Sequence, residues 1–274
     1  MLAVGVMLLA ATAPAEAVRP ARIVSLNLCA DAFLIALADR DQIAALTPSA
    51  RDPGLSDVVA LAADLPITDG SAEAVLALRP DLILASTYGR REARLLLARP
   101  GVTALELPPA ESFAQIVDQI RVIAEAVGHP QRGEALIAAM EADLARVPGP
   151  PDGARPTVVH WQRRGFVSGA GTLMDEILTR AGLDNLGRTL ARGPIDRIDL
   201  ERLVHTRPDF VLVETADPVR PDLGARLVMH PAIDRFLKPG HRLALPQSAT
   251  ICGGPGFARA VTTLAERVAA ATGR

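Results

Sequence analysis

Two aromatic side chains and two arginines are grouped in a sequence that is otherwise poor in aromatic residues. Trp161 and Phe166 flank the run Gln-Arg163-Arg164-Gly, whereas aromatic residues make up only 3% of the chain. Arginine offers forked donors to carboxylates or phosphates, and aromatic rings offer contact area. The group would suit a large, partly anionic metal chelate, with Trp161, Arg163 and Phe166 as ligand contacts. A core tryptophan beside solvated arginines is the alternative.

Further candidate contacts lie where predicted strands end. In open α/β sheets, ligands bind beyond the carboxyl ends of the strands. That rule nominates Asn27, Arg51, Tyr88 and Arg90, and Arg192 is added because it lies in a loop bounded by Gly and Pro. Arg51 is as well explained by a structural turn, and Arg90 by the start of a helix.

The machinery of a hydrolase is not evident. The motif Gly-x-Ser-x-Gly is absent, and Val167-Ser-Gly-Ala-Gly has the wrong spacing for a nucleophile elbow. The five histidines are scattered, and none forms a pair with metal-ligand spacing. The run Cys252-Gly-Gly-Pro-Gly lacks the Lys-Ser/Thr ending of a phosphate loop, so we interpret it as a loop before a terminal helix. We therefore expect neither catalytic residues nor a metal site formed by the protein alone.

The chain has two cysteines, Cys29 and Cys252. In an oxidising compartment an even number of cysteines suggests a disulfide, which here would tie the start of the mature chain to its end. Paired thiolate ligation of a bound metal is the alternative.

Composition and the N-terminus restrict the class of protein. The chain has 274 residues, of which 49% are hydrophobic and 22% charged, so it is not disordered. A net charge of −2 gives no basic field, and we expect no nucleic-acid partner. The apolar run 1–13 is too short to span a bilayer, and Ala15-Glu-Ala17 suits a signal peptidase. Residues 1–17 are therefore predicted to be a signal peptide for export.

Strands and helices alternate along the rest of the chain. The patterns predict strands at 22–27, 42–46, 65–67, 81–85, 102–107 and 157–162. They predict helices at 31–38, 71–79, 90–98, 112–127, 131–147 and 257–271. The alternation indicates an α/β fold of two βα lobes with mostly parallel sheets, joined by one long helix, with a ligand cleft between the lobes. The predicted limits are 18–128 for the N-terminal lobe, 129–156 for the spine helix and linker, and 157–274 for the C-terminal lobe.

An internal repeat favours two similar lobes. Residues 73–84 match residues 201–212 at a constant offset, and each copy contains Arg-Pro-Asp followed by three apolar residues. Each copy is predicted to be a helix, a proline stop and a buried strand.

On these motifs the sequence resembles the helical-backbone periplasmic binding proteins of ABC importers for ferric siderophores, haem and vitamin B12. The matching segments are Arg22-Ile-Val-Ser-Leu, Leu78-Arg-Pro-Asp-Leu-Ile, Phe166-Val-Ser-Gly and Arg207-Pro-Asp-Phe-Val. The resemblance implies a monomeric, non-catalytic periplasmic protein with no cofactor of its own. Such a protein carries a metal chelate to an ABC permease in the inner membrane. Phe166-Val-Ser-Gly suggests the B12-binding type, although Ser86-Thr87 stands where that type has a tryptophan.

Two other classes of protein remain open at this point. One is an exported α/β enzyme of hydrolase type, and the other is a two-lobed sensor that binds no chelate. The resemblance also implies one acidic docking residue per lobe for the permease, and Glu92 and Asp222 are nominated because each precedes Ala-Arg-Leu at a predicted helix start. Stabilisation of a helix N-terminus is the alternative role for both acids.

Overall fold

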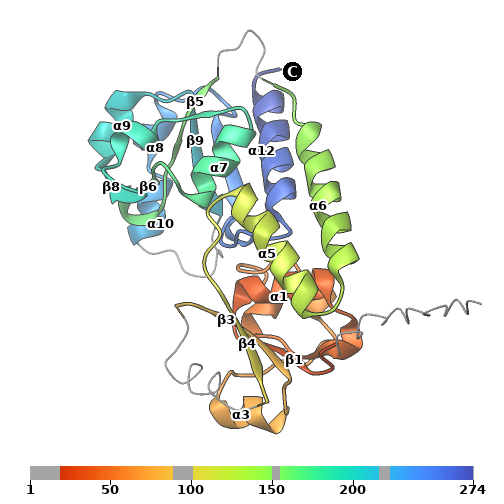
Figure 1. Ribbon diagram of the computed structural model, residues 1–274. Coiled ribbons are helices and arrows are strands. Elements are labelled where there is room, and N and C mark those ends of the chain that lie inside the picture. Colours follow the sequence, from red (N-terminus) through yellow and green to blue (C-terminus); the bar gives the residue numbers. More distant parts are fainter. Residues whose placement is uncertain (1–18, 89–100, 150–154, 216–222, 274) are drawn as a thin grey trace, which may run out of the picture.

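Two four-stranded parallel sheets form the centres of two lobes (Figure 1). The computed structural model describes residues 19–88, 101–149, 155–215 and 223–273. The strand order is β2-β1-β3-β4 in the N-terminal lobe and β7-β5-β9-β10 in the C-terminal lobe, so the two sheets have the same topology. This confirms the predicted α/β class and its parallel sheets. Among the described residues, no helix has the length and apolar character needed to cross a membrane.

The N-terminal sheet is built from short strands joined by short helices. Its strands are β1 Ile23–Ser25, β2 Ile43–Ala45, β3 Leu82–Ser86 and β4 Thr103–Leu107. Its helices are α1 Leu28–Leu37, α2 Val59–Ala62 and α3 Ala72–Ala77, with the 3-10 turns η1 Arg40–Gln42 and η2 Pro48–Arg51. The strand predicted at 65–67 is reduced to a single parallel bridge between Leu46 and Ile67, because Pro66 has no backbone N–H to donate.

The C-terminal lobe adds a two-stranded antiparallel sheet to the same plan. Its strands are β5 Thr157–His160, β6 Phe166–Ser168, β7 Asp184–Asn185, β8 Ile195–Arg197, β9 Phe210–Thr215 and β10 Arg242–Pro246. Strands β6 and β8 form the extra pair. The helices and 3-10 turns are η4 Arg163–Gly165, α7 Leu173–Arg180, α8 Gly187–Leu190, α9 Leu200–Thr206, α10 Leu223–Val228, α11 Pro231–Asp234, η5 Gln247–Ala249 and α12 Phe257–Ala271.

The repeated Arg-Pro-Asp segments do the same structural work in both lobes. Arg79 and Arg207 adopt left-handed backbone angles, with φ of 48° and 47°, and each lies between a helix and the central strand β3 or β9. The carboxylate of Asp81 accepts the backbone N–H of Arg22 at 3.0 Å, just before β1. Asp209 accepts the N–H of Thr157 at 2.8 Å, where β5 begins. Each aspartate therefore fastens the start of the neighbouring strand, far from the carboxyl ends where ligands bind.

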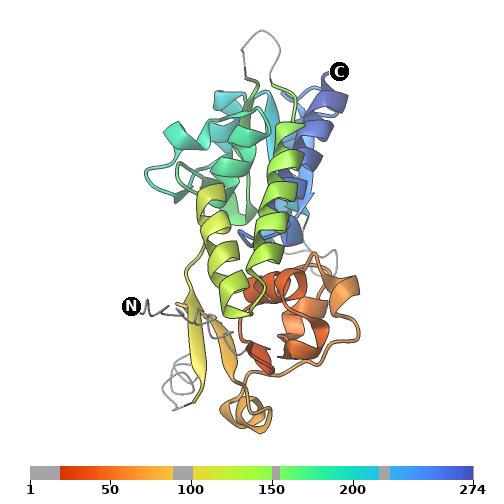
Figure 2. The same ribbon diagram turned by 45° about the vertical axis from the view of Figure 1, so that its right-hand side comes forward.

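Two long antiparallel helices lead from the first lobe to the second. Helix α5, Phe113–Ala126, begins beside the C-terminal lobe, where Phe113 stacks on Phe257 at 5.6 Å. Helix α6, Pro130–Ala145, begins beside the N-terminal lobe, where Arg132 pairs with Asp39 at 2.7 Å. Figure 2 shows α5 and α6 side by side along the molecule, with α12 next to α6. The predicted lobe limits at 128 and 157 stay predictions.

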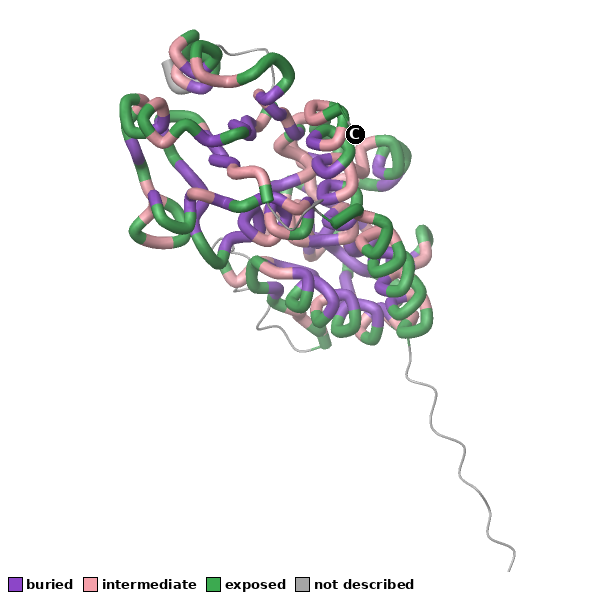
Figure 3. The backbone as a smooth tube through the Cα atoms, turned by 90° about the horizontal axis from the view of Figure 1, so that it is seen from above, coloured by how far each residue is buried: buried purple, intermediate pink, exposed green. Residues whose placement is uncertain are grey.

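The hydrophobic core is continuous between the lobes. One cluster of buried side chains contains Ile23 and Leu84 of the N-terminal sheet, Ile120 of α5, and Leu212 and Leu264 of the C-terminal lobe. Figure 3 shows, from above, that buried segments lie in the interior of the molecule and exposed segments mostly at its edge. Because the lobes share this core, we expect their relative orientation to be well defined.

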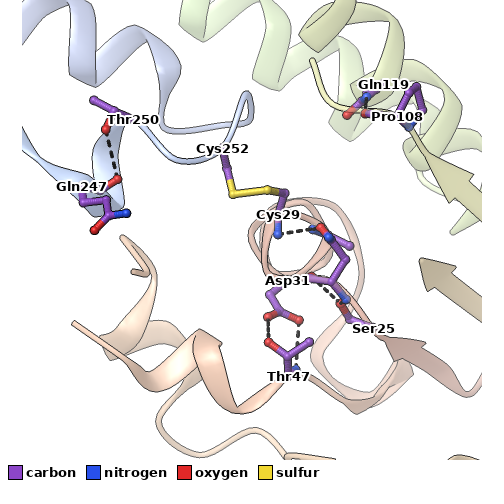
Figure 4. Close-up of a disulfide and its surroundings, with 11 residues drawn as sticks. Ser25, Cys29, Asp31, Thr47, Pro108, Gln119, Gln247, Thr250 and Cys252 are labelled. Carbon is purple, nitrogen blue, oxygen red and sulfur yellow. Dashed lines mark hydrogen bonds between the residues drawn. A yellow bond between two sulfur atoms is a disulfide. The ribbon is translucent and has the colours of Figure 1, made fainter. Parts of the chain in front are cut away.

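A glycine-rich loop before α12 fastens the C-terminal lobe to the N-terminal lobe. Cys252 of this loop is disulfide-bonded to Cys29 of α1, with 5.4 Å between their Cα atoms (Figure 4). The next residue, Gly253, packs against the segment between β4 and α5. A Cβ at this position would be 2.2 Å from the carbonyl oxygen of Ala110. Only glycine permits this approach. An ion pair between Arg259 and Asp57 lies at the end of the same loop.

Candidate functional site

A cavity of about 460 Å³ lies between the lobes. The N-terminal lobe contributes Asn27 and Ser86, which lie at the carboxyl ends of β1 and β3. The C-terminal lobe contributes His160 and Glu214 from the corresponding ends of β5 and β9, which are neighbours in the sheet. The segment 108–111 after β4 completes the wall. The carboxyl ends of both parallel sheets therefore face one cavity, as expected for ligand sites in such sheets.

Asn27 and the disulfide form one edge of this cavity. The side-chain oxygen of Asn27 accepts the backbone N–H of Cys29 at 2.8 Å and of Ala30 at 3.2 Å, so Asn27 is the N-cap of α1. This cap explains why α1 begins at Leu28, before the predicted start at residue 31. Asn27 and Cys29 both line the cavity, and the disulfide adds no free thiol there.

The opposite wall carries a chain of hydrogen-bonding side chains. Nε2 of Gln162 donates to Oγ of Ser168 at 3.1 Å, and this oxygen lies 2.9 Å from Nδ1 of His160. Nε2 of His160 lies 3.8 Å from Oε1 of Glu214, which accepts the hydroxyl of Thr250 at 2.6 Å. All five side chains line the cavity.

Burial affects the charge of the two ionisable side chains in this hydrogen-bonded series, His160 and Glu214. Desolvation lowers the pKa of His160 to about 3, so its ring is neutral at physiological pH. Burial also raises the pKa of Glu214, and the hydrogen bond from Thr250 only partly opposes that effect. The 3.8 Å separation is within the range of an ion pair, but burial favours the neutral form of each partner. We therefore treat the pair as a polar contact and not as a salt bridge.

A second cavity, of about 390 Å³, adjoins the first. Gln162 and Glu214 line both cavities, and Arg163, Arg164 and Phe166 line the second. Phe166 is 38% exposed there, and η4, which contains both arginines, packs against α10. Arg163 and Phe166 thus lie at a side chamber and not in the main cavity.

Trp161 was expected to form a wall of the cleft; it does not line the main cavity, but it lines the side chamber from within the core. Its side chain is fully buried, in a cluster with Val167, Leu203 and Val211. Successive residues of a strand point to opposite faces, so when His160 points to the cavity its neighbour points away from it. The indole N–H of Trp161 lies 3.4 Å from the carbonyl oxygen of Leu227. Trp161 is therefore a core residue, as in the alternative interpretation, that also borders the side chamber, and its role as a ligand contact stays a prediction.

Three other expected contacts lie away from the main cavity. The guanidinium of Arg51 donates to the carbonyl oxygens of Ala62 and Leu65, at 3.2 and 2.6 Å, and so stabilises a turn. Arg192 is held through its backbone N–H, which donates to Asp196 at 3.0 Å. Tyr88 is 82% exposed and is not among the described residues that line the cavity.

Some predictions fall on parts of the chain that the structure does not describe. Arg90, Glu92 and Asp222 lie outside the described residues, as does the predicted signal peptide at 1–17. The ligand-binding and docking roles of these residues stay predictions.

The sequence analysis missed His160 and Glu214. Both are the polar ends of otherwise apolar strands, Thr157–His160 and Phe210–Thr215. The rule that ligands bind beyond strand ends was applied to the loops only. Extending it back to the last polar residue within each strand would have found both side chains.

The structure does bring a serine and a histidine together, which the sequence alone did not suggest. Ser168 is only 4% exposed, however, and its oxygen is already bonded to Gln162. A nucleophile must reach a substrate carbonyl, so this arrangement fits a structural hydrogen-bond chain better than nucleophilic catalysis. Among the described residues, no group of three or more His, Cys, Asp or Glu side chains is placed to hold a metal ion.

The repeated sheets, the shared core and the cavity between them define a two-lobed binding protein. The chain belongs to the periplasmic binding protein family, whose model matches residues 23–247. Members of this family bind substrates and are not enzymes, which removes the hydrolase alternative.

Known proteins of this family support the same classification. A cobalamin-binding protein of Halobacterium salinarum is 26% identical over 198 residues, which cover 70% of this chain and 53% of that protein. The apo form of the periplasmic heme-binding protein RhuT from Roseiflexus sp. RS-1 is 25% identical, with a TM-score of 0.69, and the match covers 91% of this chain and 98% of RhuT. The uncharacterized ABC transporter substrate-binding lipoprotein YvrC of Bacillus subtilis is 30% identical over 128 residues, which cover 46% of this chain and 40% of YvrC. The chain spans about half the length of the curated relatives it matches.

Proposed function

We propose that this protein captures a metal chelate in the periplasm and delivers it to an ABC permease of the inner membrane. The chelate would be a ferric siderophore, haem or a corrinoid. The observation that carries the proposal is the cavity between the lobes, at which the carboxyl ends of both parallel sheets meet. Its volume of about 460 Å³, together with the adjoining 390 Å³, suits a ligand of several hundred daltons.

The relatives support this ligand class. One is a cobalamin-binding protein and another a heme-binding protein, and a third is an ABC transporter substrate-binding lipoprotein. A carrier of this kind works as a monomer and needs no cofactor of its own. The charged residues that would contact the permease are Glu92 and Asp222.

The visible spectrum of the full chain, purified from the periplasm of its own cell, tests the proposal. Corrinoids, haem and ferric catecholates absorb visible light with different spectra, so a bound chelate is both detected and classified. Gln119→Trp, which places a large side chain in the cavity, should remove the bound chelate, whereas Gln131→Trp on the exposed part of α6 should retain it. A colourless protein that binds none of the three chelates on titration would contradict the proposal.

A further inference from the structure

The C-terminal wall of the main cavity contains a buried ring nitrogen that lacks a partner. Nε2 of His160 has no hydrogen-bond partner among the described residues, and the side chain is 3% exposed. Oε1 of Glu214, at 3.8 Å, is too distant for a direct hydrogen bond. Buried polar atoms in native proteins are nearly always satisfied, so we expect a group from outside the described protein to lie beside these two atoms and bond to both.

The donors and acceptors of His160 and Glu214 restrict the chemical group that can bond to both side chains. If the hydroxyl of Ser168 donates to Nδ1 of His160, Nε2 carries a hydrogen and donates, and a carboxyl oxygen of Glu214 accepts. If Nδ1 donates to Ser168 instead, Nε2 becomes a second acceptor beside Glu214. A primary amide has two N–H donors and one acceptor, and so it satisfies both arrangements. A carboxylate has acceptors only, so it has no donor for Oε1 of Glu214, which is the acceptor in the hydrogen bond from Thr250.

The rest of the lining favours the same chemistry. The main cavity presents the side-chain amides of Asn27, Gln119 and Gln162 and the acids Glu111 and Glu214. Among the described residues that line it there is no arginine or lysine. Amide side chains pair with amides through matched donors and acceptors, whereas a polyanion finds no cationic partner among these lining residues.

A carboxylate-bearing chelate would have to bind in another way. Haem could direct its propionates to Arg163 and Arg164, but these line the side chamber. His160 lines the main cavity and not the side chamber, so its Nε2 would be left unpartnered in that pose.

We infer that His160 and Glu214 form a subsite for a primary amide of the bound ligand. The preferred ligand is therefore a chelate with amides at its periphery, as in a corrinoid, and not one with only carboxylates or phenolates there. This inference rests on the proposed function, namely that the cleft binds a metal chelate. It adds the chemical class of the ligand and the two side chains that would form hydrogen bonds with its amide.

Calorimetric titration of the full chain with dicyanocobinamide, haemin and a ferric tris-catecholate tests the ligand class. We expect cobinamide, which carries peripheral primary amides, to bind at least ten-fold tighter than the other two. Glu214→Ala should weaken cobinamide binding ten- to hundred-fold, the effect of leaving a buried amide N–H without its acceptor. The same substitution at exposed Glu201 on α9 is the matched control and should leave the affinity unchanged.

A change in the ligand tests the subsite without altering the protein. Cobinamides with one peripheral amide hydrolysed to a carboxylate should include at least one that binds the wild-type protein ten-fold more weakly. Glu214→Gln should reduce that difference, since its side-chain amide offers the carboxylate an N–H donor. Equal binding of all the hydrolysed forms to the wild-type protein would overturn the subsite. Tighter binding of haemin or the catecholate would overturn the ligand class but leave the proposed function intact, whereas binding of none of the three would overturn both.

Discussion

Asp31 should make the protein less stable at neutral pH than in mild acid. It lies in the first turn of α1, two residues after Cys29 (Figure 4), and its side chain is fully buried. Its carboxylate accepts the hydroxyl of Thr47 at 2.5 Å and the backbone N–H of the same residue at 3.1 Å. Burial nevertheless raises the pKa of Asp31 from 3.8 to about 6, because these hydrogen bonds do not replace the lost hydration.

The direction and size of the effect follow from this pKa. Between about pH 4 and pH 6 the folded protein holds a proton on Asp31 that the unfolded chain has released. The free energy of unfolding therefore falls as pH rises through this interval. The difference between 3.8 and about 6 corresponds to about 3 kcal/mol, at about 1.36 kcal/mol per pH unit. This loss should be complete by about pH 7.

Asp31→Asn isolates this contribution, because asparagine is neutral and can still bond both groups of Thr47. Urea unfolding at pH 4, 5.5 and 7 measures the free energy of unfolding of both proteins. We expect the variant to gain about 3 kcal/mol relative to wild type between pH 4 and pH 7. Asp118→Asn, at an exposed position of α5, should show no such gain. If the wild-type and Asp31→Asn profiles run parallel within about 1 kcal/mol, burial does not raise this pKa, and the reasoning fails.

Three further predictions concern the connection between the lobes and the core. Replacing both Cys29 and Cys252 by serine should lower the free energy of unfolding by up to about 5 kcal/mol, since the disulfide spans 223 residues; denaturant curves that coincide with those of the oxidised wild type would contradict it. Gly253→Ala should lower the free energy of unfolding by about 1–3 kcal/mol, because its methyl group would meet the carbonyl oxygen of Ala110. A methyl group at Gly149 meets nothing within 4 Å, so Gly149→Ala should be nearly neutral. Equal denaturation midpoints for the two variants would refute this. Trp161→Ala should cost about 3–5 kcal/mol of stability, as for other buried aromatics. A variant as stable as wild type in the same assay would contradict this prediction.

Structural features that depend on residues close together in the sequence, such as helix ends and the repeated segment, could be predicted from the sequence. The helix at 257–271 was predicted with the bounds that it has, and Ser112 caps α5 where the predicted helix starts. The Arg-Pro-Asp repeat predicted two similar lobes, and the two sheets indeed share one strand order. The left-handed backbone at Arg79 and Arg207 was not predicted, because left-handed angles are uncommon for residues other than glycine.

The cavity could not be predicted in the same way, because its polar groups meet only when strands and lobes are assembled. His160 and Glu214 are 54 positions apart and become neighbours because β5 and β9 pair, with His160 beside Leu212 in the register. Trp161 was predicted to contact the ligand in the main cavity because it is aromatic and lies near two arginines. Side chains alternate along a strand, however, so the adjacent His160 is the residue that lines this cavity. Arg51 was chosen for its charge, yet the nearby carbonyl groups of Ala62 and Leu65 satisfy its guanidinium. A reactive or charged side chain therefore indicates a site only after its local partners are known, and the unpartnered nitrogen of His160 is the stronger indication of a ligand.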